Sequence, residues 1–203
     1  SECNNTNTNG CTSSNLEIES KLGNTAWRNN YLSNFYQNIK KLDQNNNYHV
    51  IKNTEWGAIT YLSYSKYGLC QSNRCNRIGA NDTYISGNKT TDSTTSNIYG
   101  VFDLAGSASE FVMANYTNDI KSINLTNTHF GNIEINKFDY DLYTKDTFIL
   151  GDATLETTLK TGSWYNEQSK FVDETNTWII RGGIASTNNT GIFHYNSTTD
   201  NPN

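Results

Sequence analysis

The chain has 203 residues, of which 34% are hydrophobic and 12% aromatic, and its formal net charge is −5 at pH 7. The aromatic content excludes a disordered chain, and the basic residues form no stripe of the kind that binds nucleic acid. No apolar run is long enough to insert directly into a membrane. We therefore expect a single domain over residues 1–203 with no nucleic-acid partner.

The first predicted helix covers residues 25–42. Apolar side chains recur there every three or four residues and form one stripe, made of Trp27, Tyr31, Phe35, Ile39 and Leu42. Asn24 or Thr25 can cap the start of this helix. The segment before it, residues 16–20 (LEIES), favours a short strand.

A second helix is predicted over residues 54–67. Asn53 is a favourable N-cap for it, and Gly68 suits the position that follows the C-cap. The small residues Gly57 and Ala58 are expected to allow close packing of this helix against another element.

Beyond residue 68, short apolar and aromatic segments alternate with stretches rich in Asn, Thr and Gly, a pattern typical of short strands joined by long loops. The predicted strands are residues 99–104, 109–115, 147–150, 170–173, 177–181 and 191–195. Helices followed by strands indicate the α+β class. We expect two helices packed on a twisted antiparallel sheet with long irregular loops.

The four cysteines lie in two close pairs, each bracketing a short polar stretch. We favour local disulfides, Cys3–Cys11 and Cys70–Cys75, from the three possible connectivities. Free thiols and a zinc site are the alternatives, although neither spacing is C-x-x-C. Disulfides indicate an oxidising compartment, so we expect the protein outside the cytoplasm.

The segment Asn97–Asn115 reads NIYGVFDLAGSASEFVMAN and is the most apolar part of a polar chain. We interpret it as scaffold, because Gly100 and Gly106 permit a tight backbone and the apolar residues can supply a core. Glu110 is expected to be a buried acceptor of backbone N–H groups. A catalytic role would need a second reactive group, and the segment provides none.

Together with WIIRGGIAS at residues 178–186, this segment resembles the signature of the formylglycine-generating-enzyme-like, or sulfatase-modifying-factor, branch of the C-type-lectin fold. The resemblance covers residues 26–195 and implies a C-type-lectin-like fold. The enzymes of that family use a pair of cysteines after the RGG turn, but residues 76–203 contain none. The resemblance therefore favours its non-catalytic bacterial surface-protein branch and implies no catalytic cofactor.

Relatives in that family close the fold with a terminal strand. The end of this chain, NSTTDNPN, contains no such pattern. The resemblance thus implies that the closing strand is lacking, that the chain is a fragment, or that another segment or chain fills the gap.

In the resembling family, the segment after the RGG turn displays the variable residues that contact ligand. Gly182 and Gly183 are expected to allow the sharp turn that leads into it, and Ile192 and Phe193 to mark a strand returning to the sheet. The resemblance then implies the contacts Ser186, Thr187, Asn188, Asn189, His194, Tyr195 and Asn196, with Trp164, Tyr165 and Arg181 as neighbouring anchors. An ordinary solvated loop is the alternative.

These observations lead us to expect a non-catalytic ligand-binding module, an adhesin or receptor-binding domain, that is extracellular or at the cell surface and takes a protein or glycan ligand. The alternative is a structural subunit of a surface fibre or pilus, held by self-assembly or a strand partner. A degenerate enzyme of the formylglycine-generating type is a distant third. Calcium is a further candidate partner, through Asp139, Asp141 and Asp146 of FDYDLYTKD, although acidic loops are commonly just solvated.

Overall fold

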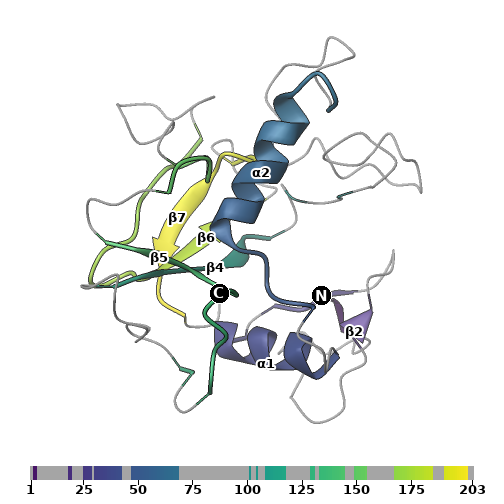
Figure 1. The fold of residues 1–203 in the computed structure, drawn as a ribbon, viewed down its shortest axis with the longest axis vertical. Coiled ribbons are helices and arrows are strands. Elements are labelled where there is room, and N and C mark those ends of the chain that lie inside the picture. The colour runs from purple at the N-terminus through teal and green to yellow at the C-terminus, as the bar shows by residue number, and fades with distance from the viewer. Residues whose placement is uncertain are drawn as a thin grey trace. The chain divides into compact units, whose positions relative to one another are not determined.

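The structure is a computed structural model that describes residues 2–3, 18–19, 25–28, 30–42, 47–68, 101, 104, 108–117, 129–130, 133–144, 149–154, 167–184 and 190–200 (Figure 1). The chain divides into two compact units. Unit 1 comprises residues 1–50, 127–135 and 199–203, and unit 2 comprises residues 51–126 and 136–198. Within the described residues, no helix is both long and apolar enough to cross a membrane.

Unit 1 contains one helix and a small antiparallel sheet. The sheet has the order β2-β1-β3, with strands β1 (Glu2–Cys3), β2 (Ile18–Glu19) and β3 (Thr25–Ala26). The strand predicted over residues 16–20 is confirmed at β2. The helix α1 spans Leu32–Leu42, so its predicted start at residue 25 is wrong, because those first residues pair in β3.

The face that α1 buries differs from the predicted stripe. Leu32 and Tyr36 are buried, and the Tyr36 ring packs edge-on against Phe130 with centroids 5.7 Å apart. Leu42, at the end of the predicted stripe, is 52% exposed. The spacing of four is therefore right, but the most buried face is shifted by one residue.

Unit 2 is built on a four-stranded sheet of order β5-β4-β6-β7. Its strands are β4 (Glu110–Tyr116), β5 (Asp141–Tyr143), β6 (Trp178–Arg181) and β7 (Tyr195–Thr198). β6 pairs antiparallel with both β4 and β7, whereas β5 pairs parallel with β4. The α+β class is confirmed, but the sheet is mixed rather than antiparallel.

Two of the predicted strands are confirmed, since residues 109–115 coincide with β4 and residues 177–181 with β6. The strand predicted over residues 191–195 is wrong, because β7 begins only at Tyr195. The rest of β7, Asn196–Thr198, lies in the NSTTDNPN end, where no strand was expected.

The remaining predicted strands are not found among the described residues. Residues 170–173 form no strand, although Ser169 makes an isolated bridge to Tyr195. The described parts of the predicted strands 99–104 and 147–150 are not strands, and the rest of each lies outside the described residues. β5 had not been predicted at all.

The helix α2 (Asn53–Tyr64) lies alongside the four-stranded sheet (Figure 1). Its N-cap residue is Lys52, whose backbone N–H donates to the Glu55 carboxylate at 2.9 Å. The prediction of Asn53 as the N-cap is therefore wrong by one residue. This shift places the Asn53 side chain inside unit 2 instead of at the end of the helix.

Gly57 allows α2 to approach a neighbouring turn closely, as predicted. A Cβ on Gly57 would lie 2.4 Å from the carbonyl oxygen of Gly151, closer than atoms can pack. Ala58 is exposed, so the same prediction is wrong for it. The helix has its C-cap at Ser65, which leaves Gly68 beyond the position predicted for it.

One apolar cluster forms the core of unit 2. Its buried members come from α2, the sheet and two loop segments: Trp56, Leu104, Val112, Ala114, Tyr116, Tyr143, Val172, Ile179 and Tyr195. Leu104 and Val112 of the Asn97–Asn115 segment lie in the core, as predicted. Glu110 is exposed, so its predicted burial is wrong, and Gly100 and Gly106 lie outside the described residues.

Candidate functional site

Arg181, the last residue of β6, is fully buried in unit 2. Its Nε donates to Asn53 Oδ1 at 2.7 Å, and its Nη2 donates to the carbonyl oxygen of Asp152 at 2.6 Å. The guanidinium also lies over the Tyr195 ring, 5.1 Å from its centroid. Burial lowers the pKa of Arg181 to about 10, so the side chain stays charged at neutral pH. These partners are what makes a cation tolerable in the core.

Asp152 supplies the opposite charge of this buried network. Its Oδ2 accepts hydrogen bonds from the Tyr143 hydroxyl at 2.7 Å and from Asn53 Nδ2 at 3.4 Å, and its Oδ1 accepts from the Thr154 backbone N–H at 3.0 Å. Asn53 therefore joins the two charges, with its oxygen toward the arginine and its nitrogen toward the carboxylate. Burial and then the charge of Asp152 raise the pKa of Tyr143, which keeps this phenol a donor.

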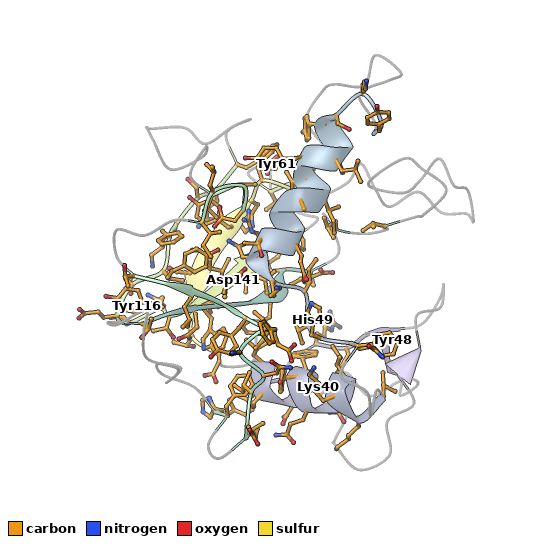
Figure 2. All side chains as sticks on the ribbon, in the orientation of Figure 1. Lys40, Tyr48, His49, Tyr61, Tyr116 and Asp141 are labelled. Carbon is orange, nitrogen blue, oxygen red and sulfur yellow. The ribbon has the colours of Figure 1, made fainter. Side chains whose placement is uncertain are left out.

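Asp141, the first residue of β5, caps the start of α2 (Figure 2). Its Oδ2 accepts from the Thr54 backbone N–H at 2.9 Å and from the Thr54 hydroxyl at 3.0 Å. A carboxylate is favourable there because the helix dipole is positive at its N-terminus. Burial raises the pKa of Asp141, and the hydrogen bonds from Thr54 oppose that shift.

The glycine pair after β6 makes the sharp turn that was predicted. Gly182 and Gly183 have φ of +77° and +74°, and the Gly183 N–H donates to the Arg181 carbonyl oxygen at 2.9 Å. A Cβ on Gly182 would also lie 2.6 Å from the carbonyl oxygen of Leu104. Glycine is required here both by the backbone angle and by the lack of space.

A second turn packs beneath the glycine pair. The His194 N–H donates to the Gly191 carbonyl oxygen at 3.1 Å and closes the turn around Ile192 and Phe193, which are both fully buried. The Trp56 indole N–H donates to the Ile192 carbonyl oxygen at 2.8 Å. Ile192 and Phe193 therefore face the core from a turn, and their predicted placement in a strand is wrong.

Comparison of the chain with family models, curated proteins and solved structures gives no match. The hydrogen bonds of the network join α2, β5, β6 and the 149–154 turn within unit 2.

The predicted ligand contacts divide into two groups. His194 and Tyr195, predicted as contacts, and Arg181, predicted as a neighbouring anchor, are buried, while Asn196 is half-buried. The other predicted contacts lie outside the described residues: Trp164, Tyr165, Ser186, Thr187, Asn188 and Asn189.

The structure describes only some of the residues in the calcium and disulfide predictions. Asp139 and Asp141 are buried, and the Asp141 carboxylate is bonded to Thr54, while Asp146 lies outside the described residues. The described residues contain no group of three or more potential metal ligands. Cys3 lies in β1, and its three counterparts lie outside the described residues, so both pairings stay predictions.

Sequence reasoning missed Asn53, Tyr143 and Asp152 as members of the network. One signal was available: Arg181 ends an apolar strand, and a cation there needs either solvent or buried partners. Nothing in the sequence named those partners, because they are far away along the chain.

Alanine at Gly182 should destabilise the protein more than alanine at Gly151. Both glycines have positive φ, which costs another residue roughly 1–2 kcal/mol. A Cβ on Gly151 would meet no atom within 4 Å, whereas one on Gly182 would meet Leu104. We expect a loss of about 1 kcal/mol for Gly151→Ala and about 2–4 kcal/mol for Gly182→Ala, measured by urea unfolding. Equal losses would show that the close approach of Leu104 is unimportant.

Proposed function

We propose that the protein is a non-catalytic ligand-binding module of the cell surface or extracellular space, with a C-type-lectin-like fold and a protein or glycan ligand. The observation that best supports this is the anchoring of the segment between the two turns. Thr190 Oγ1 donates to the Ile184 carbonyl oxygen at 3.2 Å, so the segment leaves and rejoins the scaffold at one place. Loops held in this way on a rigid scaffold commonly carry binding residues.

The proposed binding surface is narrower than the one first predicted. Arg181, His194 and Tyr195 are buried, so we leave them out of the proposed direct contacts. Ile184, at the start of the loop, is 52% exposed and adds an apolar contact. The proposed contacts are now Trp164, Tyr165, Ser186, Thr187, Asn188, Asn189 and the half-buried Asn196. Such residues combine aromatic anchors with adaptable hydrogen-bonding groups.

The second candidate is a structural subunit of a fibre, and β7 favours it. β7 is an edge strand of the described sheet. Its outer edge is paired at Tyr195, whose N–H donates to Gln168 and whose carbonyl oxygen accepts from Lys170. Within the described residues, that edge has no further pairing along Asn196–Thr198, so a strand from another chain could extend it.

Binding can be tested by screening the full chain on glycan and protein arrays. A hit should then be measured with a variant carrying Ser186→Ala, Asn188→Ala and Asn189→Ala. Removing these hydrogen-bonding groups should weaken binding at least about tenfold, since each lost contact is worth roughly 0.5–1.5 kcal/mol. The melting temperature should stay within a few degrees, because the proposal places these side chains against the ligand and not in the core.

The matched control is Glu174→Ala with Thr175→Ala, two exposed residues before β6. This variant should bind like the wild type. Equal weakening by both variants, or none by the loop variant, would place the ligand elsewhere. Concentration-dependent assembly in light scattering, with no array hit, would favour the fibre subunit.

A further inference from the structure

His194 is a buried histidine, 3% exposed, and its Nδ1 has no hydrogen-bond partner among the described residues. The ring lies against the glycine turn, since a Cβ on Gly183 would be 3.3 Å from Nδ1. A neutral imidazole can leave this nitrogen as an unprotonated acceptor. An imidazolium would carry an N–H there with nothing among the described residues to accept it. The surroundings therefore favour the neutral ring.

The buried cation of Arg181 also favours the neutral form of His194. Arg181 is fully buried, and its Nη1 has no hydrogen-bond partner within the described part of the chain. Burial and then the charge of Arg181 lower the pKa of His194 from 6.5 to about 4. Among the described residues, the other titratable groups that contact this turn, Arg181 or Tyr195 are Tyr61 and Tyr64 of α2, Asp152, Glu167, Lys170 and Tyr195 itself. Glu167 is buried against Gly191, and its charge acts on Arg181.

The backbone of His194 closes the turn that buries two apolar side chains. Ile192 and Phe193 pack with Ala153, and the Phe193 ring lies 5.2 Å from that of Tyr64. The turn is tied to α2 by the Trp56 hydrogen bond to Ile192. Displacement of the His194 ring would therefore release a turn that holds apolar surface against α2.

We propose that the Gly191–His194 turn is an acid-sensitive latch: protonation of His194 opens it and uncovers Ile192 and Phe193. The sign follows from linkage, because the closed turn binds the proton less well than the open one. The latch is fully stable above pH 6.5 and loses stability as the pH falls through about 4. The difference between these values shifts the closed–open equilibrium toward the open form by up to about 300-fold.

Hydrogen exchange of the intact chain, read by mass spectrometry, can test the latch. Peptides that cover residues 190–195 are compared at about pH 7 and about pH 4, after correction for intrinsic exchange rates. We expect protection in this segment to fall at least about tenfold in acid, while peptides from β4 stay protected. The variant His194→Gln, which cannot be protonated in this range, should lose most of this response.

His129→Gln is the matched control, because His129 lies in unit 1 and is bonded to Asp200. It should keep the acid response of residues 190–195. If His194→Gln does not fold, His194→Leu removes the same titration and serves in its place. The latch would be overturned if protection of residues 190–195 did not change in acid. It would also be overturned if His194→Gln or His194→Leu responded to acid as the wild type does, or if β4 lost protection at the same time.

Discussion

Replacing Arg181 with methionine should lower the free energy of unfolding by roughly 3–5 kcal/mol, the usual cost of removing one partner from a buried charge network. Methionine fills part of the volume but leaves the Asp152 carboxylate without its counter-charge. It also removes the donor to Asn53 Oδ1 and the donor to the Asp152 carbonyl oxygen. Urea unfolding followed by tryptophan fluorescence would measure the loss.

A matched control and a double variant separate the charge from the change of side chain. Lys170→Met removes an exposed cation from the same unit and should cost no more than about 0.5 kcal/mol. Adding Asp152→Asn to Arg181→Met removes the stranded carboxylate and should restore part of the stability. A loss of less than about 1 kcal/mol for Arg181→Met would show that the network contributes little.

The parts of the fold that sequence predicted are those that depend on local chemistry. β4 and β6 were predicted because apolar and β-branched residues there suit a buried strand. Gly182 and Gly183 were predicted because a sharp turn needs positive φ, which glycine adopts at no steric cost. Gly57 was predicted for the same local reason, the absence of a side chain.

The errors arise where distant residues decide the outcome. Asn is a common N-cap residue, but the side chain of Asn53 is hydrogen-bonded to Arg181, Tyr143 and Asp152 and is therefore buried in the core. The short strand β5 was missed because its parallel pairing with β4 depends on residues far away in the sequence.

The candidate site shows the same division. The glycine turn was predicted from the sequence. The sequence did not predict which neighbouring residues would be buried and which exposed. His194 and Tyr195 are polar enough to suggest a surface, yet both are buried: Tyr195 lies in the core cluster with Trp56 and beneath the Arg181 guanidinium. Tertiary contacts thus bury residues that the sequence predicted as ligand contacts.

Replacing Trp56 with alanine should lower the free energy of unfolding by about 3–5 kcal/mol, as large-to-small changes of buried aromatic residues do. Trp56 is fully buried in α2 and belongs to the core cluster. Its indole N–H also bonds the Ile192 carbonyl oxygen, which has a second, longer hydrogen bond of 3.4 Å from Thr60. The loss should appear in urea unfolding and, for residues 190–195, in faster hydrogen exchange.

Trp56→Phe distinguishes the hydrogen bond from the packing, because phenylalanine keeps a ring but lacks the N–H donor. The matched control is Trp27→Phe in unit 1, where the buried indole N–H has no partner among the described residues. Both variants lose similar ring volume, so Trp56→Phe should cost about 0.5–1.5 kcal/mol more than Trp27→Phe. It should also expose residues 190–195 to exchange, because Ile192 would keep only the longer bond to Thr60. Equal losses, with residues 190–195 still protected, would show that apolar packing rather than the indole bond holds this turn on α2.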